Sequence, residues 1–177
     1  LSVQVDGKSM MEPIENYGVK VLSIGFFTKP EQAVIWRGPM AAKALNQMIF
    51  DASWGELDFL LIDLPPGTGD IAISLGQLIP ASEIIVVTTP QIAAAEVAER
   101  AGRIAHQLKQ HVIGVIENMS AYTDPVSGAQ IALFGQGGGQ ETAKRLSQLV
   151  GVDVPLLAQI SFDIKLREGG DEGSPIV

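Results

Sequence analysis

Residues 58–70 read DFLLIDLPPGTGD, and this stretch decides the fold class. It begins with a short apolar run that ends in the carboxylate of Asp63, a pattern typical of a strand buried on both faces of a parallel sheet. The prolines and glycines that follow indicate a loop. From Asp70 to about Leu78 the apolar residues have helical spacing. The stretch therefore predicts a strand, a loop and a helix in succession.

The same succession recurs along the chain. Short runs rich in Val and Ile predict strands at 20–26, 83–88, 112–117 and 152–156, and helical patterns lie at 39–51, 91–110 and 141–150. Strands that alternate with helices imply right-handed crossovers and a mostly parallel sheet with helices on both faces. We therefore expect an α/β fold, and the length of 177 residues is that of one domain, 1–177.

Charge and composition exclude several classes of protein. There are 12 Lys and Arg against 20 Asp and Glu, a net charge of −8, and no basic run, so nucleic acid and anionic membranes are poor partners. Without cysteine the chain has no disulfide and no thiol nucleophile. It has no apolar stretch of about 18 residues and no cationic start, which predicts a cytoplasmic protein. Because it opens on Leu1 rather than Met, we expect an N-terminal part to be missing.

Asp63 is the first candidate site residue, because ligands of open parallel sheets lie beyond the carboxyl ends of the strands. A buried carboxylate needs a partner, and in nucleotide-binding α/β proteins this is Mg²⁺ or its water. Glycine at position 67 would let a backbone N–H approach a γ-phosphate. The alternative for an acid here is to stabilise a turn or a helix start, which we favour for Asp70 but not for Asp63.

Asn118 is the second candidate, because it follows the apolar run 112–117 and so lies at the same edge of the sheet. Its amide carries both a donor and an acceptor, which suits the edge of a purine base. The alternative is that the side chain satisfies its own loop, and the residue type taken alone favours that alternative.

Two glycine-containing segments imitate phosphate-binding loops. Gly7-Lys8-Ser9 ends like GxxxxGK[ST], but Ser2 stands where the first glycine belongs and no strand precedes it, so we reject it. The segment 135–139, GQGGG, lacks the GxGxxG spacing, and a flexible connector is the favoured interpretation.

Several motifs in one order resemble a known family, the Mrp (ApbC) P-loop ATPases of the deviant Walker, SIMIBI class. They are SIGFF at 23–27, AVIWRGPM at 33–40, DLPPGTGD at 63–70, TTPQ at 88–91, ENMS at 117–120 and FGQGGG at 134–139. Members of this family carry iron–sulfur clusters. The resemblance runs from about Gly18 to the C-terminus and implies a P-loop NTPase-like α/β domain that binds ATP and Mg²⁺.

The resemblance also implies roles for individual residues. Asp63 resembles the Walker B aspartate, which is catalytic and lies near Mg²⁺ through water, and Asn118 resembles the adenine-contacting Asn. The segment 65–70, with Pro65, Gly67 and Thr68, resembles switch II, in which Gly67 senses the γ-phosphate. The loop at Pro155 would close over the base. The family acts as a homodimer or with a close relative, with nucleotide at the interface.

The chain departs from the family pattern in two places. The Walker A loop would lie upstream of Leu1, so we predict that these 177 residues bind ATP weakly and hydrolyse it negligibly. Many members also have a Cys-x-x-Cys between ENMS and FGxGGG, whereas the stretch 121–133 has no thiol. Asp124 and Ser127 are hard, poorly suited iron–sulfur ligands. This leaves three explanations. The cysteines lie in the missing N-terminal part, this member binds the cluster through other ligands, or it has kept the ATPase and lost the cluster.

The leading functional hypothesis is an ATP-hydrolysing iron–sulfur cluster carrier of the Mrp type, whose nucleotide cycle gates a dimer and which meets scaffold and recipient proteins. One alternative is an adaptor or regulatory dimer on the same fold that does not hydrolyse ATP. A second is a positioning ATPase of the ParA/MinD type, which the segments SIGFF, WRGPM and ENMS disfavour.

Overall fold

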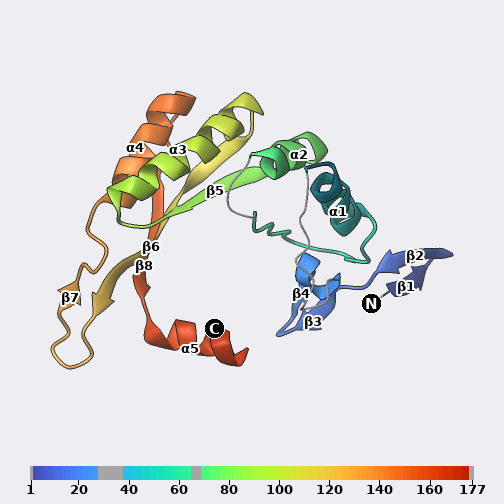
Figure 1. Ribbon diagram of the computed structural model, residues 1–177, viewed down its shortest axis with the longest axis horizontal. Coiled ribbons are helices and arrows are strands. Elements are labelled where there is room, and N and C mark those ends of the chain that lie inside the picture. Colours follow the sequence, from blue (N-terminus) through green and yellow to red (C-terminus); the bar gives the residue numbers. More distant parts are fainter. Residues whose placement is uncertain (1, 28–37, 65–68, 176–177) are drawn as a thin grey trace. The chain divides into compact units, whose positions relative to one another are not determined.

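The computed structural model describes residues 2–27, 38–64 and 69–175 (Figure 1). The chain divides into two compact units, Leu1–Ile79 and Pro80–Val177, which are described separately below. No helix in the described ranges is long and apolar enough to cross a membrane. That the chain forms a single domain stays a prediction.

The first unit opens with two β-hairpins. The strands β1 (Ser2–Val5) and β2 (Lys8–Met11) pair antiparallel, as do β3 (Ile14–Asn16) and β4 (Val19–Val21). Each is closed by two residues with positive φ, Asp6-Gly7 and Tyr17-Gly18, as the common two-residue hairpin turns require. The triplet 7–9 is therefore a turn and a strand start, not a phosphate-binding loop. The strand expected at 20–26 is divided between β4 and the 3₁₀ turn η1 (Ile24–Phe27).

Two helices complete the first unit. The helix α1 (Gly38–Phe50) packs against α2 (Asp70–Leu78), which has the bounds that the sequence predicted. The end of α1 is joined to the first hairpin by two backbone hydrogen bonds, from Met11 N to Asp51 O and from Ser53 N to Met11 O, both 2.8 Å long.

The segment 58–63 is not a strand, which corrects the expectation on which the fold prediction began. It has no regular secondary structure, and Phe59 and Leu61 are 85% and 88% exposed. A strand of a parallel sheet needs a neighbour that pairs with its N–H and C=O groups. Among the described residues of this unit, no strand is paired with 58–63. The apolar pattern alone therefore does not produce the strand.

The second unit contains the parallel sheet. The strands β5 (Glu83–Thr88) and β8 (Leu156–Phe162) both pair in parallel with β6 (His111–Thr123), which lies between them. The short strand β7 (Gln130–Ile131) turns back antiparallel onto the end of β6. The strand predicted at 152–156 is displaced, because Pro155 has no N–H to give to a ladder and β8 begins directly after it.

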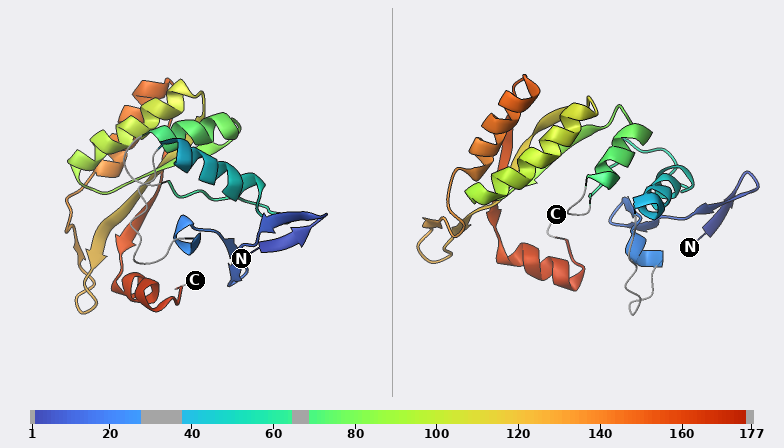
Figure 2. Two further views of the ribbon diagram at one scale, coloured as in Figure 1. Left: turned by 45° about the vertical axis from the view of Figure 1, so that its right-hand side comes forward. Right: turned by 45° about the horizontal axis from the view of Figure 1, so that its top comes forward.

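Two helices cover one face of this sheet. The helices α3 (Ile92–Gln107) and α4 (Gly138–Val150) lie side by side over it, yellow-green and orange in Figure 2. The core between them and the sheet consists of Val86, Ala98, Ala105, Val112, Val115, Ala143, Leu146 and Val154. On β5, Val86 faces this core while Ile85 and Val87 are exposed. The α/β class is confirmed, and within this unit α3 and α4 lie on one face of the sheet.

The last described helix lies after the last element that the sequence analysis predicted. The helix α5 (Ile164–Glu172) begins after Asp163, whose carboxylate accepts a hydrogen bond from Lys165 N at 2.7 Å. This is a conventional N-cap, in which the side chain satisfies a backbone donor of the first turn. The helix closes at Gly173, which has a φ of 69°.

Candidate functional site

The carboxyl end of the parallel sheet is organised around Glu117 on β6. Its side chain is 1% exposed. Oε2 accepts a hydrogen bond from the backbone N–H of Gly139 at 2.6 Å, and Oε1 accepts one from Nε2 of Gln159 at 2.7 Å. A buried carboxylate with both oxygens occupied is an expected arrangement, because an unpaired one would be costly. Glu117 thus joins β6 to α4 and to β8.

The glycines before α4 make this contact possible. A Cβ at Gly138 would stand 2.5 Å from the carbonyl oxygens of Thr89 and Pro90. A Cβ at Gly139 would stand 2.7 Å from the Cβ of Glu117. Both distances are too short for any side chain. The interpretation as a flexible connector is therefore wrong for Gly138 and Gly139, which begin a helix packed against the end of β5 and against Glu117 on β6.

Asn118 lies next to this carboxylate and is half-buried. Its Oδ1 accepts a hydrogen bond from Met119 N at 2.9 Å, and Met119 has a φ of 57°. Among the described residues, no hydrogen bond to the Asn118 amide nitrogen is found. The oxygen thus serves its own chain segment, as the alternative interpretation expected, while the nitrogen remains a donor for a ligand. Contact with adenine stays a prediction.

Pro155 is exposed, and its carbonyl oxygen accepts a hydrogen bond from Val115 N at 2.9 Å. Asn118 pairs instead with Ile160, further along β8. Asn118 lies three residue steps after Val115 on β6, which amounts to about 10 Å. The structure therefore places Pro155 before β8 rather than at the same end of the sheet as Asn118, and a role in closing over the base stays a prediction.

The remaining predicted site residues belong to the first unit. Asp63 is exposed and, within the described ranges, makes no hydrogen bond or ion pair. Pro65, Gly67 and Thr68 lie outside the described residues. Asp70 was expected as an N-cap, but Gly69 holds that position and Asp70 is the first residue of α2. A carboxylate there is still favoured, because it lies at the positive end of the helix dipole.

The turn after β6 occupies the place where the family resemblance led us to look for cluster ligands. Asp124 Oδ1 accepts hydrogen bonds from Ser127 N at 2.7 Å, Val126 N at 2.9 Å and Ser127 Oγ at 2.9 Å. The backbone hydrogen bond from Ser127 is the main cause that lowers the pKa of the Asp124 carboxyl, followed by those from the Ser127 hydroxyl and from Val126 N. The described part of the chain has no group of three or more His, Asp or Glu placed to hold a metal ion.

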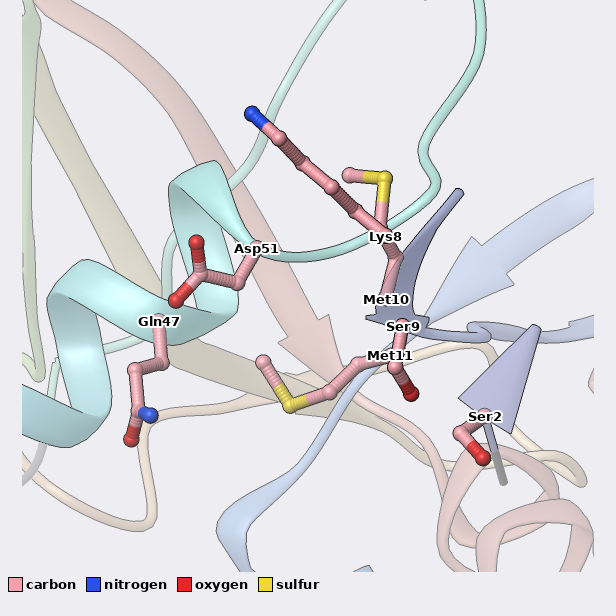
Figure 3. A pocket seen from close by; sticks show the side chains of 7 residues that line it. All are labelled: Ser2, Lys8, Ser9, Met10, Met11, Gln47 and Asp51. Carbon is pink, nitrogen blue, oxygen red and sulfur yellow. The ribbon is translucent and has the colours of Figure 1, made fainter. Parts of the chain in front are cut away.

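The first unit also has a hollow, which is shown in Figure 3. It has a volume of about 490 Å³ and is lined by Ser2, Lys8, Ser9, Met10, Met11, Gln47 and Asp51. It is open to solvent, and none of the residues predicted for nucleotide binding lines it. The candidate site considered below is therefore the carboxyl half of β6, at Glu117 and Asn118.

Comparison with known proteins places the chain in a family. The family model described as ParA: NUBPL iron-transfer P-loop NTPase matches residues 2–177. The "Iron-sulfur cluster carrier protein" of Mycobacterium leprae (strain TN) is 59% identical over 170 residues, which is 96% of this chain and 44% of that protein. The protein of the same description from Bacillus subtilis (strain 168) is 43% identical over 88% of this chain and 42% of its own length.

A plant relative and a solved structure extend this comparison. The "Iron-sulfur protein required for NADH dehydrogenase, mitochondrial" of Arabidopsis thaliana is 37% identical over 98% of this chain and 54% of its length. A nucleotide-binding protein from Archaeoglobus fulgidus, solved in complex with ADP, has a TM-score of 0.73 and 32% identity over 97% of this chain and 64% of that one. The chain thus spans about half the length of the curated relatives.

These matches agree with the Mrp-type motifs and with the fold. The parallel sheet, the helices on its face and the acid-containing segment 58–70 all lie within the matched range. The chain belongs to the NUBPL iron-transfer family of P-loop NTPases.

Proposed function

We propose that this chain is part of an ATP-hydrolysing carrier of iron–sulfur clusters, and that it spans about half of that protein's length. The observation that carries the proposal is Asn118, which has an amide nitrogen with no partner in the described residues and lies beside a locked carboxylate at the carboxyl half of β6. Ligands of parallel sheets bind at this edge. The match to an iron-transfer NTPase family and to relatives described as cluster carriers supports the choice of ligand and cargo.

Mg²⁺ and ATP fit the residues that are present. The Asp63 carboxylate is exposed and has no partner in the described part of the chain, which suits Mg²⁺ held through a water molecule. Mg²⁺ would supply charge neutralisation on the phosphates. In this proposal Asp63 orients the hydrated ion, Gly67 gives its backbone N–H to the γ-phosphate, and Pro65 and Thr68 shape the switch segment.

The nucleotide cycle would gate a homodimer that passes its cargo between scaffold and recipient proteins. These 177 residues contribute no thiolate to that cargo, because they contain no cysteine. The Asp124 carboxylate already accepts three hydrogen bonds from its own turn. We therefore propose that the turn 124–128 is not a cluster ligand in this protein.

ATP hydrolysis by the full-length gene product tests the catalytic part of this proposal. Asp63→Ala should lower turnover at least about hundredfold, because the metal loses its orienting carboxylate. Asp58→Ala is the matched control, since it removes another exposed carboxylate from the same segment. Equal turnover of both variants and the unmodified protein would refute the role of Asp63. The 177-residue chain alone should show negligible turnover, and ordinary turnover would contradict that expectation.

The cargo is tested by anaerobic reconstitution of the full-length gene product with iron and sulfide, followed by iron and sulfide analysis. A stable cluster whose yield is unchanged by Asp124→Ala and Ser127→Ala would support a carrier that does not use this turn. Loss of the cluster in either variant would overturn that assignment. If no cluster forms and no ATP is hydrolysed, a non-hydrolysing adaptor becomes the better account.

A further inference from the structure

The buried carboxylate of Glu117 has no part in the roles assigned above, although it is the most enclosed acid next to the candidate site. Its oxygens accept from two donors on separate elements, Gly139 on α4 and Gln159 on β8. These donors lie 22 and 42 residues away in the sequence. One carboxylate therefore holds three elements together at the carboxyl half of the sheet.

We propose that Glu117 is a positioning residue for nucleotide binding, because its buried carboxylate ties β6 to β8 and to the first turn of α4 and so fixes the place of the Asn118 amide. This inference rests on the proposed function, in which Asn118 contacts the base.

The pairing of β6 with β8 shows why Asn118 depends on its neighbour. Glu117 pairs with Gln159 and Asn118 with Ile160, and the regular register ends there, because it shifts between Asn118 and Tyr122. Directly after Asn118 the chain adopts the positive φ of Met119. Asn118 is thus held by regular pairing on its upstream side only. On that side, the Glu117 carboxylate adds hydrogen bonds to Gly139 and Gln159.

The close packing at Gly139 limits where the carboxylate can go. A Cβ there would stand 2.9 Å from Oε2 of Glu117 and 3.0 Å from Cδ1 of Leu156. The helix turn, the carboxylate and β8 are therefore in contact without spare room. Removal of the carboxylate leaves the Gly139 N–H without its acceptor, and β6 around Asn118 can then shift relative to α4 and β8.

The test compares binding of ATP, CTP and inorganic tripolyphosphate, each with Mg²⁺, to the full-length gene product by isothermal titration calorimetry. Tripolyphosphate has phosphate groups and no base, so a change at the base edge leaves its affinity unaltered. Glu117→Ala should weaken ATP about tenfold and bring it close to CTP, with tripolyphosphate unchanged within about twofold. Glu117→Gln should retain most of the preference, because its oxygen can accept from Gly139 while the Gln159 amide turns over.

The matched control is Gln110→Ala. Gln110 is buried like Glu117 and its Nε2 donates to Ser82 Oγ at 2.6 Å, but it lies at the opposite end of the sheet, just before β6. This variant loses a buried polar contact and should keep its preference for ATP over CTP. If it loses that preference to the same extent as Glu117→Ala, the effect is a general loss of stability and the positioning role is refuted.

A milder variant covers the case in which Glu117→Ala does not fold. Gln159→Ala removes one of the two donors from an exposed position on β8 and should weaken ATP by about threefold, again without effect on tripolyphosphate. An equal loss for ATP and tripolyphosphate, or no loss for either, would overturn the proposal. If the unmodified protein binds ATP no better than tripolyphosphate, the proposed base contact itself fails, and the role of Glu117 fails with it.

Discussion

The backbone N–H of Gly139 donates a hydrogen bond of 2.6 Å to the buried Oε2 of Glu117, and this contact joins the ENMS segment to the FGQGGG segment. Both segments were recognised in the sequence as separate signatures. In the structure they form one arrangement, in which the carboxylate of a residue on β6 binds the first turn of α4.

Gly139→Ala should destabilise the protein by about 1–3 kcal/mol, because the added methyl group would stand 2.7 Å from Cβ of Glu117 and must displace it. Urea unfolding followed by circular dichroism measures this. Gly170→Ala in α5 is the matched control, since a Cβ there has no atom within 4 Å and should change stability by less than about 1 kcal/mol. Equal stability of the two variants would contradict the packing argument.

Gly102→Ala should also destabilise the second unit, by about 1–3 kcal/mol, because a Cβ on α3 would overlap with the buried Leu146 of α4. The cost should be smaller in a Leu146→Ala background, where the space is vacated, although Leu146→Ala alone should cost about 2–5 kcal/mol. A double-mutant cycle measured by urea unfolding gives the coupling. Strict additivity of the two changes would show that the helices do not meet at this point.

Asn118→Ala should reduce the preference of the full-length gene product for ATP over CTP by about tenfold, because it removes an amide nitrogen that has no hydrogen-bond partner among the described residues and can donate to a purine. Competition binding with a fluorescent ATP analogue measures it. Asn16→Ala is a close control, since Asn16 Oδ1 also accepts from the next residue, Tyr17, at 3.1 Å, and Tyr17 also has a positive φ. A similar loss in both variants would mean that the effect arises from the turn geometry.

The turn at Asp124 should loosen in acid. Hydrogen bonds to the Asp124 carboxyl hold its pKa in the folded protein below the ordinary value, and the bond from the Ser127 backbone N–H has the largest effect. A lowered folded-state pKa means that the turn's contribution to stability is present above the unfolded pKa of about 3.9 and is lost as the pH falls through the folded value. NMR titration of the Ser127 amide should show a midpoint below about 3.9, and Asp124→Asn should abolish the titration. A midpoint at or above 3.9 would contradict the hydrogen bonding.

The comparison of α2 and β5 with 58–63 shows which elements the local apolar spacing predicts correctly. The bounds of α2, Asp70–Leu78, and of β5, Glu83–Thr88, are those that the apolar spacing predicted. The segment 58–63 has an equally clear strand pattern and is not a strand. A helix satisfies its own backbone, whereas a strand depends on a neighbour, so the same kind of pattern succeeds in one case and fails in the other.

Some residues of the candidate site could likewise be predicted from the sequence, and others could not. Asn118 and Asp63 were found from residue type and position after an apolar run, and their placement on exposed or half-buried segments is compatible with ligand binding. Glu117 was missed, although a carboxylate that closes an apolar run was the signal used for Asp63. Its burial depends on Gly139 and Gln159, which no local pattern connects with it.

The sequence by itself determined the α/β class, the order of most elements and the family, because apolar periodicity and motif order are local properties of the chain. Only the tertiary structure decided that Glu117 is the buried acid, that β8 begins after Pro155, and that Gly138 and Gly139 form a packed helix turn. These features require hydrogen bonds and close approaches between segments far apart in the sequence. Such contacts exist only once the chain has folded.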